Sequence, residues 1–117
     1  MDCKDFTHHC YQYWVFLRAA KLKVSIAVVC AEHEQQKLTI TMQMAEFVLS
    51  GEQFSLLSLY DQAQLTLRTN LEIHNARVAK SDADAIKIEA DEALIIATKN
   101  YNEMHDRLEA LGGFYSP

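Results

Sequence analysis

Glycine and proline are almost missing from this chain. Its 117 residues contain three glycines, two of them adjacent near the end, and one proline, which is the last residue. A β-sandwich or β-barrel needs turn residues about every ten positions, so these folds are disfavoured. Half of the residues are apolar and 23% are charged, which is typical of a folded chain. The sequence therefore predicts an all-α fold.

The clearest helix is predicted over residues 83–111. Its apolar positions recur at steps of three and four residues, which places them on one helical face. Gly112 suits the left-handed conformation that often follows a helix end. The face comprises Ala83, Ile86, Ala90, Ala93, Ala97, Tyr101, Met104, Leu108 and Leu111.

The same spacing predicts a second helix over residues 53–80. Ser50 and Gln53 have the form of a capping box at its start, and Ser81 and Asp84 have that form at the start of the next helix. A short turn at 81–82 would make the two helices antiparallel. The packing stripe of this helix is expected to comprise Leu57, Tyr60, Gln64, Leu67, Leu71, His74 and Val78.

Residues 1–49 fit two patterns. Alternation of polar and apolar residues in 21–26 and 37–44 allows a β-hairpin at 21–44, giving an α+β fold in which two long helices follow the hairpin. The connector 31–36 argues for helix, because it has no Gly, Asn, Asp or Pro and is rich in helix formers. In a helix, one apolar stripe comprises Phe6, Cys10, Tyr13, Leu17, Ala20, Val24, Ala27, Ala31, Leu38, Met42, Ala45 and Leu49.

A second apolar stripe follows the same segment and has no evident partner in the chain. A helix over residues 5–49 would be about 67 Å long, against about 42 Å for each of the other two. Either it breaks near 32–36 or the surplus stripe meets a second copy. We therefore expect one helical domain over 1–117, an antiparallel bundle of three to four helices, and a homodimer or larger homo-oligomer. The second stripe comprises Val15, Ala19, Leu22, Ile26, Val29, Ile40, Met44 and Phe47.

The charge and the cysteine content limit the functions and locations that can be expected. The net charge is −5, and although residues 1–31 carry a balance of +2, the rest carries −7. Nucleic-acid binding is therefore disfavoured, because it relies on clustered Lys and Arg. Cations interrupt the best apolar run, so no membrane span is expected. Three cysteines cannot form a complete disulfide set, and no secretory signal is visible, which favours a cytoplasmic location.

Two groups of residues indicate an alternative function, a small helical enzyme or a metal sensor. Cys10, Cys30 and His33 are residue types that bind zinc, but the spacing of known zinc motifs is absent. Arg68 and His74 resemble the Arg…His signature of HEPN-type ribonuclease domains, which are also small and all-α. That resemblance covers one motif and implies a ribonuclease site at these two residues. We expect no cofactor, since no phosphate-binding glycine motif is present.

The favoured function is a small acidic protein–protein interaction module, such as an adaptor, a secretion chaperone or an inhibitor. It would act through an apolar and aromatic helix face, because aromatic anchors often carry interface energy. Acidic residues at the start of the last helix would steer a basic partner. The expected binding residues are Tyr11, Tyr13, Trp14, Phe16, Asp82, Asp84 and Asp91.

Overall fold

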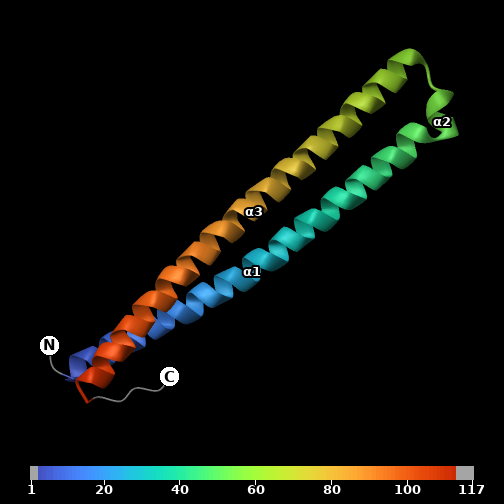
Figure 1. Cartoon of the computed structure of the whole chain (residues 1–117). Coiled ribbons are helices and arrows are strands. Elements are labelled where there is room, and N and C mark those ends of the chain that lie inside the picture. Colours follow the sequence, from blue (N-terminus) through green and yellow to red (C-terminus); the bar gives the residue numbers. More distant parts are fainter. Residues whose placement is uncertain (1–2, 113–117) are drawn as a thin grey trace. The chain divides into compact units, whose positions relative to one another are not determined.

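The computed structural model describes the backbone of residues 3–112, and the side chains of the same range apart from residues 3–7 and 9. The described chain is all-α and contains no strand. Helix α1 spans Cys3–Ser50, the single turn α2 spans Glu52–Ser55, and α3 spans Leu59–Ala110 (Figure 1). The all-α prediction is confirmed, and the alternative of a β-hairpin at 21–44 is wrong, because those residues lie inside α1.

The helices form two compact units. Unit 1 contains α1 up to Val28 and α3 from Ile86 onward, and unit 2 contains residues 29–85 with α2 and the turn. In each unit a segment of α1 lies beside a segment of α3, and the two run in opposite directions (Figure 1). Two long helices do not make the predicted bundle of three to four within one chain.

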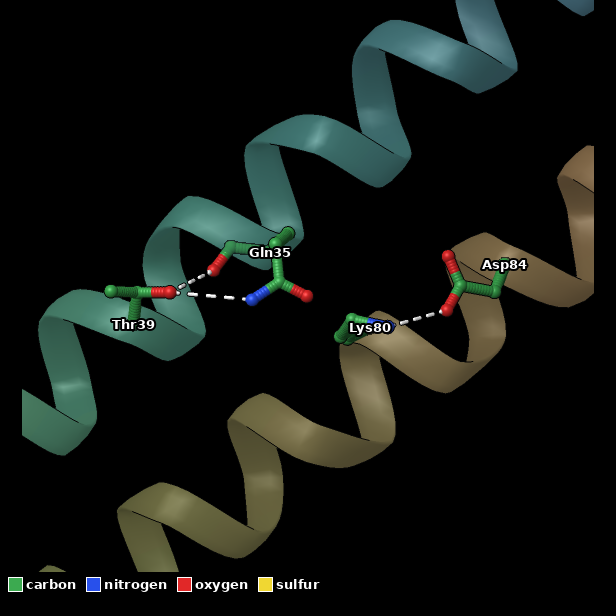
Figure 2. A network of polar contacts seen from close by, with 4 residues as sticks. All are labelled: Gln35, Thr39, Lys80 and Asp84. Atoms are coloured by element: carbon green, nitrogen blue, oxygen red, sulfur yellow. Dashed lines mark hydrogen bonds and ion pairs between the residues drawn. The ribbon is translucent and has the colours of Figure 1, made fainter.

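The expected helix boundary at 81–82 is wrong, because α3 continues through it. The segment offers exposed polar residues but neither Gly nor Pro, so nothing in it ends a helix. An ion pair of 2.7 Å between Lys80 Nζ and Asp84 Oδ2 spans it one helical turn apart (Figure 2). Helix α1 likewise continues through 32–36, where Gln35 and Thr39 are joined by hydrogen bonds (Figure 2).

The turn uses a different serine from the one expected. Ser50 donates its hydroxyl hydrogen bond back to the Glu46 carbonyl (2.6 Å), and the cap of α2 at Gly51 has no side-chain bond. Ser58 instead caps α3, because its Oγ accepts a hydrogen bond from the Asp61 N–H at 3.1 Å. Gly51 lies close to the backbone of α1: a Cβ there would lie 3.2 Å from the Phe47 carbonyl oxygen, a tight contact.

Loss of the Ser58 cap is expected to destabilise the protein measurably. Ser58→Ala leaves an N–H of the first turn of α3 without its side-chain partner, which costs about 1 kcal/mol of folding free energy. Urea unfolding at fixed protein concentration measures the effect. Ser55→Ala is the matched control, because its hydroxyl only donates to the Glu52 carbonyl within α2. Equal midpoints for the two variants would contradict the assignment of Ser58 as the cap.

The end of α3 is as expected. Gly112 has a φ of 78°, the left-handed conformation that glycine adopts without strain. Its N–H donates to the Glu109 carbonyl at 2.9 Å.

The buried seam between the helices is made mainly of small residues. Seven apolar residues are buried among those described, and four of them are alanines. Most of these residues belong to the first stripe predicted for residues 1–49, whose described members are buried or half-buried except for Met42, which is exposed. Phe6 lies outside the described side chains. The seven are Cys10, Leu17, Ala20, Ala27, Ala31, Ala45 and Leu108.

The packing stripe predicted for residues 57–78 is wrong. Leu67, Leu71 and Val78 are exposed, and the side that turns toward α1 in unit 2 carries Thr69 together with the half-buried Leu65 and Ile73. Thr69 is 7% exposed and lines a small cavity together with Thr41 and Ala45 of α1. A face chosen by the size and apolarity of its side chains is therefore the wrong one for this segment. Helices that pack closely accept small residues such as alanine and threonine at their contact.

Candidate protein-binding surface

Large apolar side chains are gathered outside the seam. In unit 1 the surplus stripe of α1 is exposed throughout: Leu22 keeps 61% of its surface accessible and Ile26 keeps 55%. Residues 15, 22 and 26 are offset by more than a quarter turn from the buried positions 17, 20 and 27. They therefore lie on the side of α1 that turns away from α3. We call Val15, Leu22 and Ile26 the outer stripe of α1.

Helix α3 of unit 1 exposes a comparable face. Its seam positions are half-buried or buried, and its isoleucines are not among them. Three accessible isoleucines and two glutamates lie on the side that turns away from α1. We call this set the outer face of α3: Ile88, Ile95, Ile96, Glu89 and Glu92.

The predicted aromatic residues form two ring contacts on α1. The Tyr11 and Trp14 ring centroids lie 5.8 Å apart, and those of Tyr13 and Phe16 lie 6.3 Å apart in a T-shaped pair. The Arg18 guanidinium lies 5.1 Å from the centre of the Trp14 ring, within cation–π range. Tyr13 and Trp14 are half-buried, whereas Tyr11 and Phe16 are exposed. The cluster is thus partly core and partly surface.

The predicted acidic residues belong to both units. Asp82 and Asp84 lie in unit 2, and Asp91 lies in unit 1. Asp82 and Asp91 are exposed, while Asp84 is half-buried and holds Lys80.

The two residues of the alternative catalytic pair are six positions apart on one helix, α3. Arg68 and His74 are both exposed on α3 of unit 2. Arg68 lines the cavity beside Thr69, and His74 does not line it.

The alternative zinc ligands differ in environment. Cys10 is fully buried in unit 1, and burial raises the pKa of its thiol. Burial raises the pKa of Tyr101, and the charge of the Cys10 thiolate in the same unit raises it further. Cys30 and His33 are exposed in unit 2.

Burial makes Cys10 a sensitive reporter of helix packing. Its raised thiol pKa leaves less thiolate at pH 8, and thiolate is the reactive form. In a Cys3→Ser background, Cys10 is expected to react with iodoacetamide at least about tenfold more slowly in buffer than in urea. Peptide mass spectrometry measures the rate at this residue. Equal rates in the two solvents would contradict the packing of Cys10 against α3.

Two features were not found by sequence reasoning. A groove of about 660 Å³ at the turn of unit 2 is lined mostly by apolar residues, among them Phe47, Phe54 and Leu57. Phe54 lies in a segment that is too short for the spacing of its apolar residues to indicate a helical face. In unit 1, His105, Asp106 and Glu109 place ligand atoms within 4.8 Å of one another, but both carboxylates are exposed, which is common without an ion.

The sequence matches no known family model, and no curated protein or solved structure shows significant similarity to the chain. Among the described residues, no helix is long and apolar enough to cross a membrane.

Proposed function

We propose that this chain is a small acidic protein–protein interaction module whose first partner is a further copy of itself. The observation that carries the proposal is the inverted distribution of apolar side chains. Four of the seven buried apolar residues among those described are alanines, while large side chains such as Leu22, Ile26 and Phe47 are exposed. Burying an alanine contributes much less than burying a large aliphatic side chain. Contacts with a second copy would supply the missing burial.

The exposed area supports the same proposal. The chain exposes 8603 Å², whereas a compact monomer of 13.4 kDa is expected to expose about 6500 Å². The excess, about 2000 Å² for each copy, matches what obligate interfaces bury. Monomeric proteins rarely leave large apolar patches uncovered. In the assembly, helices of several copies would complete the antiparallel helical bundle that one chain does not form.

Further roles are proposed from the same surfaces. Tyr11 and Phe16 are accessible aromatic anchors for a protein ligand. Asp82 and Asp91 are accessible acids that would favour a basic one. An adaptor, a secretion chaperone and an inhibitor all use such faces. An exposed free thiol at Cys30 suits a reducing compartment, which supports the cytoplasm as the site of action.

Light scattering on the purified full chain tests the proposal. The expected mass is at least twice 13.4 kDa, and it should fall on dilution toward the monomer. A mass of one chain at every concentration would contradict self-association and leave the outer stripe without its proposed partner.

A further inference from the structure

Unit 1 carries opposite charges on its two helices. The α1 segment from Cys10 to Val28 contains Arg18, Lys21 and Lys23 and no acidic residue. The α3 segment over 87–99 contains Glu89, Asp91 and Glu92 in its interior, with one lysine at each end, Lys87 and Lys99. The three cations of α1 and the three acids of α3 are exposed, and none of these six forms an ion pair among the described residues. These charges flank the outer stripe of α1 and the outer face of α3.

This distribution determines which faces attract each other. Contact between two α1 stripes would bring three cations against three cations, and contact between two α3 faces would bring acids against acids. Contact between α1 of one copy and α3 of the next joins opposite charges around two apolar surfaces. Like-charge contacts across an interface are costly, so charges of this kind select the partner surface even where they add little affinity.

We propose that copies associate heterologously, with the outer stripe of α1 docking on the outer face of α3 of the next copy. This inference rests on the proposed self-association and adds the pairing of surfaces. Each copy has both surfaces, on opposite sides of unit 1, and therefore takes up one neighbour on each side. Such an interface produces a closed ring where the rotation between copies closes and an open filament where it does not.

Charge reversal tests the pairing of surfaces. The basic-side variant carries Arg18→Glu and Lys23→Glu, and the acidic-side variant carries Glu89→Lys and Glu92→Lys. Each variant alone is expected to associate about tenfold or more weakly than the wild type at low salt, because its two surfaces then repel. An equimolar mixture is expected to recover the wild-type mass by light scattering, because every contact between unlike variants joins opposite charges.

A chain with all four substitutions is the matched control, because it has the net charge of the wild type. It is expected to assemble by itself, and circular dichroism checks its helix content. Two results would overturn the pairing while leaving self-association intact. One is that either variant assembles as strongly as the wild type. The other is that both fail to assemble and their mixture fails as well. A wild-type chain that stays monomeric would instead overturn the proposed function itself.

Discussion

Replacement of Leu22 and Ile26 by glutamine is expected to abolish self-association. Both side chains are exposed in the single chain, so the substitutions remove no burial within it. In the assembly each would be buried, and each contributes about 1.5–3 kcal/mol. Their joint loss raises the dissociation constant at least about a hundredfold. Sedimentation velocity at matched concentrations measures the change.

The control for this variant keeps the outer stripe apolar. Leu22→Met with Ile26→Leu is expected to retain the wild-type mass, because size and apolarity are nearly conserved. Glutamine is as good a helix former as leucine, so helix propensity does not explain a loss in the first variant. An unchanged mass for the glutamine variant would show that the outer stripe is not the contact surface.

Truncation of Leu108 is expected to have the largest effect on stability of any substitution in the seam. Leu108 is fully buried in unit 1, and apart from Leu17 the other buried apolar residues are alanines and a cysteine. Leu108→Ala leaves a cavity and removes buried methyl groups, which costs about 2–5 kcal/mol of unfolding free energy. Because few large side chains among the described residues are fully buried, no neighbouring side chain is available to fill the cavity. Urea unfolding followed by circular dichroism measures the cost.

Leu111→Ala is the matched control for that experiment. Leu111 lies three residues further along, is 54% exposed, and is expected to change stability by less than about 0.5 kcal/mol. Similar losses for the two variants would contradict the position of Leu108 in the seam.

The helical class could be predicted from the sequence, and so could the buried side of α1. Both follow from local rules: scarce turn residues, and apolar positions from Cys10 to Ala45 at helical spacing. The surplus stripe of α1 was also recognised, because it repeats at the same spacing without a partner. Its exposure in unit 1, at Leu22 and Ile26, agrees with that prediction.

The packed side of α3 in unit 2 could not be predicted in this way. Leu67, Leu71 and Val78 form the more apolar stripe, yet Thr69 is the buried residue. Periodicity indicates which residues share a face, but not whether that face meets α1 or another chain. The continuity of α3 was missed for a related reason. The pattern of Ser81 and Asp84 fits the start of a helix as well as it fits a helix interior. The Lys80–Asp84 ion pair, which spans this point of α3, is seen only in the structure.

The opposite charges of the two helices in unit 1 are recognised only when the sequence and the structure are taken together. The sequence shows that Arg18 and Lys23 are far from Glu89 and Glu92 along the chain. The structure places all four side chains in water, on two helices of one unit.

We propose that the fold of one chain is completed by further copies. Thermal unfolding of the wild-type protein, followed by circular dichroism over about a hundredfold range of concentration, tests it most directly. If folding and assembly are coupled, the midpoint of unfolding rises with protein concentration. A midpoint that stays constant over the whole range, with a mass of 13.4 kDa in solution, would contradict the claim.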